Sequence, residues 1–191
     1  MKLKYTLLLA MILWTCEMQA QWSVQPGIGM SIPITGYNTI SNSGILYQLN
    51  VSKRLKNDRW GVGLMLGWGR MHNDDNPSDV FENARLDQVP ILVTADYELT
   101  DKKWIPYLGF GMGVSLYNLS YDLSPTSGET EFNASFSIMP ALGLRMKVND
   151  KVFPFIEANY PMVMDGPPPG TGKADKATGY IGIALGAAYR F

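Results

Sequence analysis

The most constraining feature of this chain is an alternation of apolar residues with small or polar residues, repeated along eight segments. It is clearest where Trp60, Leu64 and Trp68 alternate with glycines such as Gly61 and Gly63. Successive side chains of a β-strand point to opposite faces, so a period of two predicts strands with one apolar face. The predicted strands cover residues 22–33, 45–55, 60–70, 89–99, 104–116, 136–148, 152–162 and 179–191.

The connections between these segments alternate in length. Short polar turns lie at 56–59, 100–103 and 148–151. Long polar stretches lie at 34–44, 71–86, 117–134 and 163–177. Short turns at one rim and long loops at the other are typical of strands that run up and down. The expected fold class is therefore all-β: an eight-stranded antiparallel up-and-down β-barrel, with both ends of the barrel on the short-turn side.

The first residues are typical of a secretory signal peptide. Lys2 and Lys4 give a positive start, residues 5–14 form an apolar run, and Ala20 offers a small residue for cleavage. This run is too short for a transmembrane helix, which needs about 20 residues. We expect residues 1–20 to be a signal peptide for export.

Cys16 leaves a second interpretation of the signal open. A lipoprotein would carry an acyl chain on this cysteine, but Leu13-Trp14-Thr15 before it lacks the small residues that such sites favour. Cleavage after Ala20 instead leaves a chain without cysteine, which suits an oxidising compartment outside the cytoplasm. The remaining residues, 21–191, are then one barrel domain.

Alternation alone does not separate a membrane barrel from a soluble one, in which the apolar stripe would surround a ligand inside. The non-apolar face is rich in glycine, alanine and serine, where a water-facing strand would carry more lysine, glutamate and threonine. Charged residues make up 17% of the chain, against roughly 25% in soluble domains. No segment after the signal is apolar enough for a membrane helix, so a spanning chain must form a closed barrel. We expect a transmembrane barrel with lipid on its apolar face.

Aromatic residues of the apolar face lie near the ends of the predicted strands, where lipid meets water in a membrane barrel. The residues that we expect to be interfacial aromatics are Trp22, Trp60, Trp68, Tyr97, Trp104 and Tyr160. Trp68 and Tyr160 lie toward the long-loop rim and the other four toward the short-turn rim. Tyr189 and Phe191 also lie at the short-turn rim. The sequence therefore predicts two aromatic girdles.

Several of these features together carry a family resemblance. The glycine-rich run Pro106-Tyr107-Leu108-Gly109-Phe110-Gly111 and the closing Ala187-Ala188-Tyr189-Arg190-Phe191 accompany the alternating spans and the export signal. The chain resembles the small outer-membrane β-barrel proteins of Gram-negative bacteria, which include the OmpA membrane domain, OmpX and the PorT-like proteins. This resemblance implies location in the bacterial outer membrane. It also implies that Tyr189 and Phe191 form the aromatic signal read by the barrel-assembly machinery.

The face predicted to be lumenal carries charged residues, most of them near the short turns. They are Arg54, Asp96, Glu98, Arg145, Lys147, Glu157 and Arg190. Eight strands leave an interior barely wide enough for side chains, and charges in such a lumen need partners. We expect an ion-paired network that plugs the lumen. A path for protons or ions is the alternative.

The loop around His72 offers the strongest candidate for catalysis. His72, Asp74, Asp75 and Ser78 are residue types that barrel acyltransferases and deacylases of lipid A use. A solvated loop is the simpler interpretation, because no predicted strand holds these side chains in a fixed geometry. Asp79 could join Asp74 and Asp75 around calcium, but the spacing lacks the EF-hand pattern. We therefore expect no catalytic residue and no metal site.

A second loop superficially matches a nucleotide-binding motif. The run Pro167-Pro168-Pro169-Gly170-Thr171-Gly172-Lys173 contains the glycine and lysine of a phosphate-binding loop. That motif needs a glycine where Pro167 stands and a serine or threonine where Ala174 follows the lysine. We therefore expect no nucleotide and no other cofactor.

The composition narrows the expected function. The net charge is −1, without the basic face that a nucleic-acid partner requires. The expected function is non-enzymatic: a barrel with a plugged lumen that serves envelope structure or interactions through its outer loops. The expected partners are outer-membrane lipid, the barrel-assembly machinery and a protein of the envelope or of the cell exterior. The two alternatives are an outer-membrane lipid-modifying enzyme and a narrow channel for small solutes.

Overall fold

The computed structural model describes residues 21–35, 43–55, 59–72, 82–123, 126–129, 133–164 and 178–191. The predicted signal peptide, with Cys16 and Ala20, lies outside these residues, so export by this segment stays a prediction. The acidic loop residues Asp74, Asp75, Ser78 and Asp79 and the run 167–173 also lie outside them. Within the described residues there is no helix long and apolar enough to cross a membrane.

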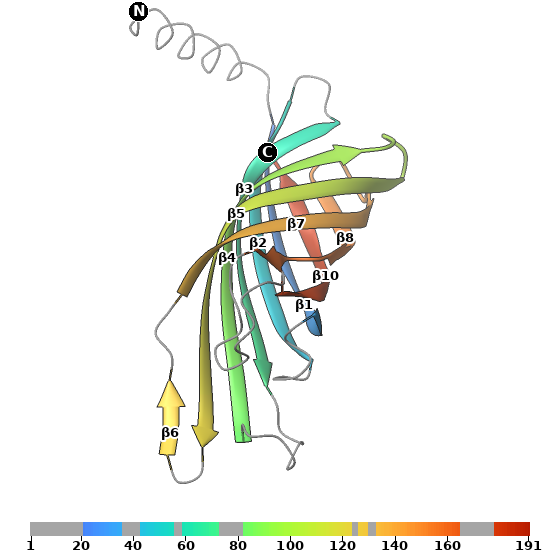
Figure 1. Ribbon diagram of the computed structural model, residues 1–191. Coiled ribbons are helices and arrows are strands. Elements are labelled where there is room, and N and C mark those ends of the chain that lie inside the picture. Colours follow the sequence, from blue (N-terminus) through green and yellow to red (C-terminus); the bar gives the residue numbers. More distant parts are fainter. Residues whose placement is uncertain are drawn as a thin grey trace, which may run out of the picture.

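The described residues form one antiparallel sheet of ten strands (Figure 1). Its strands are β1 (Trp22–Thr35), β2 (Gly44–Arg54), β3 (Trp60–His72), β4 (Glu82–Glu98), β5 (Trp104–Leu123), β6 (Thr126–Glu129), β7 (Asn133–Met146), β8 (Val152–Asn159), β9 (Met162–Val163) and β10 (Thr178–Arg190). β9 continues the line of β8, because both pair with β7 and β10. β6 pairs only with β5, so eight strand positions make up the wall. The predicted eight-stranded up-and-down β-barrel is confirmed.

The barrel closes where the first strand meets the last. β1 pairs with β10 from Ser23 opposite Arg190 to Thr35 opposite Gly179. At the short-turn rim, the backbone N–H of Trp22 donates to the carbonyl of Phe191 at 3.0 Å, and the N–H of Phe191 donates to Trp22 at 2.9 Å. Closure leaves no open edge in the part of the wall that crosses lipid.

Two strands extend farther from the short-turn rim than the sequence pattern predicts. β4 and β5 run on into the stretches 71–86 and 117–134, and β6 adds a short third strand to this extension (Figure 1). A strand with water on both faces needs no apolar alternation, although its backbone ladder continues. The alternation therefore marks the bilayer-crossing part of each strand, and it misses the extension.

The wall separates an apolar outer face from a lumen. On β3, Leu64 is 53% exposed whereas the adjacent Met65 is 4% exposed. The same contrast separates Phe110 from Tyr107 on β5. Large apolar side chains are exposed on the outer face of every long strand, and water does not stabilise a surface of this kind. The predicted assignment of the apolar face to the outside of the barrel is confirmed.

Six prolines lie inside the described strands, where each removes a backbone donor; two are in β1, and the other four lie beside breaks in a ladder. The ladder between β3 and β4 skips Pro90, and the ladder between β4 and β5 stops one residue before Pro106. The ladder between β7 and β8 begins next to Pro140 and ends next to Pro154. Each of these four prolines therefore lies where a neighbouring strand leaves the ladder.

Candidate functional site

A cluster of charged side chains fills the lumen at the short-turn end. We call it the arginine cluster; its members are Arg54, Asp96, Glu98, Arg145 and Arg190, and all five are buried. They come from β2, β4, β7 and β10, which lie around the barrel. Asp96 and Glu98 share a face because they are two residues apart in one strand. Alternation alone therefore directs the members of this cluster inward.

The arginine cluster is held by ion pairs that cross the lumen. Arg54 Nη2 lies 2.8 Å from Asp96 Oδ2 and 2.9 Å from Glu98 Oε1. Arg145 Nη1 lies 3.0 Å from Asp96 Oδ2 and 2.7 Å from Glu98 Oε1. Arg190 also pairs with Glu98 Oε1. Glu98 pairs with all three arginines, so removing its carboxylate would take from Arg190 the ion pair described here, and an unpaired buried cation is strongly destabilising.

Aromatic rings and an amide complete the surroundings of the guanidinium groups. The guanidinium of Arg145 lies 3.8 Å from the ring centre of Tyr107, and that of Arg190 lies 4.0 Å from the ring centre of Phe153. Arg145 Nη2 donates to Gln25 Oε1 at 2.9 Å. Stacking on aromatic faces and hydrogen bonding fix the planar groups in orientation.

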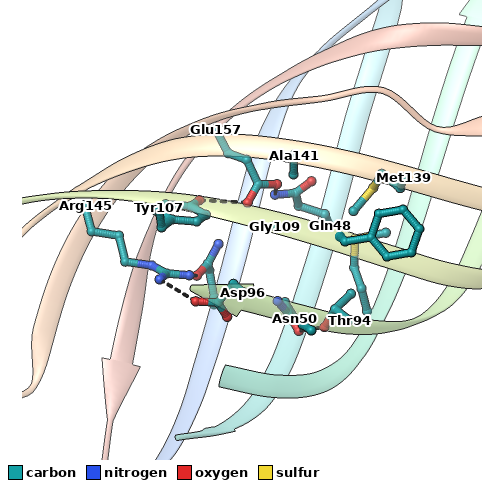
Figure 2. A pocket seen from close by; sticks show the side chains of 14 residues that line it. Gln48, Asn50, Thr94, Asp96, Tyr107, Gly109, Met139, Ala141, Arg145 and Glu157 are labelled. Carbon is teal, nitrogen blue, oxygen red and sulfur yellow. Dashed lines mark hydrogen bonds and ion pairs between the residues drawn. The ribbon is translucent and has the colours of Figure 1, made fainter. Parts of the chain in front are cut away.

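Glu157 lies in a second buried cluster, one layer farther from the short turns (Figure 2). Its carboxylate accepts hydrogen bonds from the Tyr107 hydroxyl at 2.7 Å, from Gln48 Nε2 at 3.0 Å and from Asn159 Nδ2 at 3.1 Å. Tyr107 thus contacts Arg145 with its ring and Glu157 with its hydroxyl. The three arginines and three carboxylates of the two clusters balance in charge.

Little space remains between these clusters. The cavity that both clusters line measures about 20 Å³ and is also lined by Met65 and Met139. A volume of this size holds about one water molecule. The lumen is therefore closely packed at this level.

Toward the long-loop end, charged side chains give way to apolar layers and to uncharged polar side chains such as Gln88, Ser115 and Ser137. Met65, Leu92 and Met139 form one buried apolar layer. A larger one follows, made of Leu46, Met71, Leu86, Tyr117, Val163, Tyr180 and Ala184. The buried inward residues of β4 show the change along a single strand, from Glu98 and Asp96 through Thr94 and Leu92 to Gln88 and Leu86, so that the charges lie only in its short-turn half. Charged groups thus occupy the half of the lumen at the short-turn rim.

Lys147 is expected in the lumenal network, and the structure corrects this. β7 ends at Met146, so Lys147 lies in the turn that follows, where its side chain is 42% exposed. Its Nζ pairs with Asp150 at 2.8 Å, and this hydrogen bond lowers the pKa of the Asp150 carboxyl. Lys147 lines a cavity of about 370 Å³ at the mouth of the barrel, with Arg190 and Glu98 at its inner side. Alternation directs a side chain into the lumen only within a strand, so it does not place Lys147, which follows the end of β7.

The expected interfacial aromatics lie on the outer face near the strand ends. Trp22, Trp60 and Trp104 are exposed, and the ring centres of Trp60 and Tyr97 lie 4.9 Å apart. The other aromatics have separate surroundings. Trp68 stacks on Tyr47 at 5.5 Å, and Tyr160 lies between β8 and β9. The ring centres of Tyr189 and Phe191 lie 6.1 Å apart. Neither the girdles nor the assembly signal is tested by these positions, and both stay predictions.

His72 is expected in a solvated loop, and the structure places it in a strand instead. It is the last residue of β3 and lies opposite Arg85 of β4, with its side chain exposed. No group of three potential metal ligands occurs within the described residues. The other members of the catalytic set considered for this loop, Asp74, Asp75 and Ser78, lie outside those residues, so the structure does not bring them together with His72.

Sequence reasoning missed the uncharged members of the site. Gln25, Gln48 and Asn159 point inward by the same alternation that identifies Glu157, so the signal was present. Tyr107 stands out in the sequence only as a bulky residue among glycines. Its partners lie on β7 and β8, and a partner across a barrel depends on the stagger of the strands, which the sequence does not state.

The closed antiparallel wall, the exposed apolar outer face and the buried polar clusters inside define a small transmembrane β-barrel. A family model described as the outer membrane protein beta-barrel domain matches residues 6–191, and the chain belongs to this family. The protein is accordingly located in the bacterial outer membrane.

Solved structures agree with this assignment. A major outer membrane protein from Thermus thermophilus matches with a TM-score of 0.58 and 15% identity, covering 90% of this chain and 99% of that chain. Ail, the attachment invasion locus protein of Yersinia pestis, in complex with the heparin analogue sucrose octasulfate, has a TM-score of 0.54 and 15% identity, over 91% and 100%. Neisserial surface protein A has a TM-score of 0.52 and 18% identity, over 90% and 97%. These likenesses establish the fold alone. A search of curated proteins found no significant match.

Proposed function

We propose that this protein is a non-enzymatic outer-membrane barrel with a plugged lumen, which serves envelope structure or interactions through its outer loops. The observation that carries the proposal is the filling of the lumen. Two polar clusters at the short-turn half and two apolar layers beyond them leave a cavity of only about 20 Å³ between the clusters. An ion crossing this lumen would have to displace buried, ion-paired side chains and then pass the two buried apolar layers, and both steps are costly.

The proposed orientation places the short turns in the periplasm and the long loops outside the cell, as in other barrels of the outer membrane. The aromatics Trp22, Trp60, Tyr97 and Trp104 then lie at the periplasmic interface of the bilayer, and Trp68 and Tyr160 lie toward the outer one. The proposed partners are lipid along the wall, the barrel-assembly machinery during insertion, and an envelope or extracellular protein at the loops.

Single-channel recording tests the plug. The purified full chain, reconstituted into planar bilayers, is expected to give no steady openings. Insertion is checked in the same preparation by the slower or faster gel migration of unboiled relative to boiled protein. Steady openings from inserted protein would contradict the plugged lumen and favour the channel alternative.

The enzymatic alternative is tested separately. Cells that produce the wild-type chain and cells that produce His72→Ala are compared by mass spectrometry of their lipid A. Identical acylation patterns in both strains and in cells without the protein are expected. A change in acylation that depends on His72 would defeat the non-enzymatic proposal.

A further inference from the structure

The apolar outer wall ends abruptly at one level on three adjacent strands. On β3 the outward-facing residues are apolar up to Trp68, and Arg70 comes next on the same face. Arg70 lies opposite Asp87 of β4, and Asp87 lies opposite Asn118 of β5. The next row up is equally polar, because it pairs Arg85 with His72 and Ser120. Two rows of polar residues therefore lie on the outer face directly beyond the end of the apolar, lipid-facing surface.

Three charged side chains in these rows form what we call the outer-wall patch: Arg70, Arg85 and Asp87. Arg70 Nε lies 2.7 Å from Asp87 Oδ1, and Arg85 Nε lies 2.9 Å from Asp87 Oδ2. The guanidinium of Arg70 also lies 4.7 Å from the ring centre of Trp68. One carboxylate and one indole thus hold two arginines at the upper limit of the apolar wall.

The outer-wall patch has the charge and the geometry to bind an anion. Two cations and one anion give it a net charge of +1. Each arginine side chain is 41% exposed, whereas that of Asp87 is 15% exposed, so the accessible part is cationic. Both arginines use Nε toward Asp87, and within the part of the chain that the structure describes no carboxylate pairs with the edge formed by their two Nη nitrogens. That edge matches the oxygens of a phosphate group.

We propose that the outer-wall patch binds the phosphate group of a lipid in the outer leaflet. The patch faces sideways from the barrel, above Trp68, at the level where lipid headgroups lie. The acyl chains of the same lipid would cover the apolar side chains below, such as Leu66 on β3 and Val93 on β4, so a single ligand explains both surfaces. The inference rests on the proposed orientation, with the long loops outside, and is independent of the plugged lumen.

Native mass spectrometry of the full chain tests this site. The protein is refolded in nonionic detergent micelles that contain equal amounts of bisphosphorylated lipid A and phosphatidylcholine, and the lipids retained after release are counted. The wild type is expected to retain bisphosphorylated lipid A in preference to phosphatidylcholine, whose single phosphate is balanced by its own choline cation, and in preference to lipid A without phosphates. The double variant Arg70→Gln/Arg85→Gln is expected to retain at least about tenfold less, because each cation near a headgroup contributes about fivefold.

Three further variants make the test specific. Lys102→Gln/Lys103→Gln removes the same two charges from an exposed turn at the opposite rim and is expected to leave retention unchanged. Asp87→Asn removes the carboxylate that competes with phosphate and is expected to increase retention. Arg70→Lys/Arg85→Lys keeps both charges without the fork of nitrogens and is expected to give an intermediate loss, which covers the case that the glutamine variant does not fold.

Several outcomes would overturn the proposal. Equal retention by the wild type and the folded glutamine variant would do so, as would a loss of retention in Asp87→Asn. Displacement of lipid A by inorganic phosphate, or tight binding of a sulfated polysaccharide in place of lipid, would assign the patch to a soluble anion. None of these outcomes affects the conductance experiment, so the two proposals fail separately.

Discussion

Gly143 and Tyr107 face each other on neighbouring strands, and their pairing shows how single residues shape this lumen. They are register partners between β7 and β5. A Cβ on Gly143 would lie 2.5 Å from both Cε1 and the hydroxyl of Tyr107, closer than atoms can approach. The glycine therefore gives the tyrosine ring its place between Arg145 and Glu157. Glycine weakens a strand in general, so a close approach of this kind explains its use here.

At the residue scale, we predict that Gly143→Ala destabilises the barrel. The methyl group displaces the Tyr107 ring and breaks its hydrogen bond to Glu157. Overpacking and loss of a bond to a charged group should together lower the free energy of unfolding by about 1–3 kcal/mol. Urea unfolding in lipid vesicles, followed by tryptophan fluorescence, measures the change.

Gly69→Ala is the matched control for this variant. Gly69 also faces the lumen from a strand, but a Cβ there meets only the Tyr180 ring, at 3.5 Å and beyond. Its stability should stay within about 0.5 kcal/mol of the wild type. Equal unfolding of the two alanine variants would show that the contact with Tyr107 is not what matters at position 143.

Much of the lumen could be predicted at this scale, and the reason is specific. The alternation by itself assigns Asp96 and Glu157 to the inner face, because each lies between outward-facing apolar neighbours. It assigns Arg54 to that face because Arg54 is in phase with Gln48, Asn50 and Ser52. It does not state which charge meets which, because Arg145 pairs across the lumen with residues of β4. It also fails beyond strand ends, which is why the pattern misplaces Lys147.

At the element scale, β10 combines two duties. It closes the barrel against β1, and it carries Tyr189 on its outer face, with Phe191 directly after its last residue; both side chains are exposed at the short-turn rim. Their two rings form a small exposed apolar surface at the short-turn end of the outer wall. Closure depends on the backbone of β10, whereas recognition by assembly proteins would depend on these side chains. The two duties can therefore be separated by substitution.

We predict that Tyr189→Ser/Phe191→Ser lowers the amount of folded barrel in the outer membrane of cells several-fold. The backbone ladder of β10 is unchanged, so the purified variant should still refold in detergent. Unboiled and boiled samples on a gel report folding in both settings. The matched control is Trp60→Ser/Tyr97→Ser, which removes a pair of contacting aromatic rings from the same rim. If both double variants are lost from cells equally, β10 carries no special assembly signal.

The sequence predicts the elements best near the short turns. β3 begins at Trp60 and β5 at Trp104, as the pattern indicates. At the opposite rim the predicted strands 89–99 and 104–116 are too short, since β4 already starts at Glu82 and β5 continues to Leu123. Beyond the apolar wall the outward residues of β4 are charged, as Arg85 and Asp87 are, so the alternation of apolar and polar residues no longer reports the ladder, although Leu86 on the inner face stays buried.

At the scale of the whole molecule, both ends of the barrel and the turns that follow β2, β4 and β7 lie at one rim (Figure 1). The charged half of the lumen lies at this same rim. The lumen is thus charged at one end, whereas at the other end its buried residues are apolar or uncharged. The orientation of the barrel in the membrane decides which end faces the periplasm.

We predict that an epitope inserted between Asp101 and Lys102 is hidden on intact cells and becomes accessible to antibody after the outer membrane is permeabilised. An epitope inserted within residues 165–177 should bind antibody on intact cells. Antibody binding measured by flow cytometry distinguishes the two sides. The reverse pattern would invert the barrel and with it the assignment of the outer-wall patch to the outer leaflet.

The pairing of β1 with β10 has a consequence for how the barrel folds. Ser23 and Arg190 are nearly as distant as two residues of the barrel domain can be, yet they are neighbours in the ladder. Contacts between remote parts of a chain form slowly, because the intervening loop must be closed first. Until that seam is joined, two rows of backbone amides would stand unsatisfied in hydrocarbon. The barrel therefore becomes stable only when β10 pairs with β1, and a barrel without this pairing is not stable in the membrane.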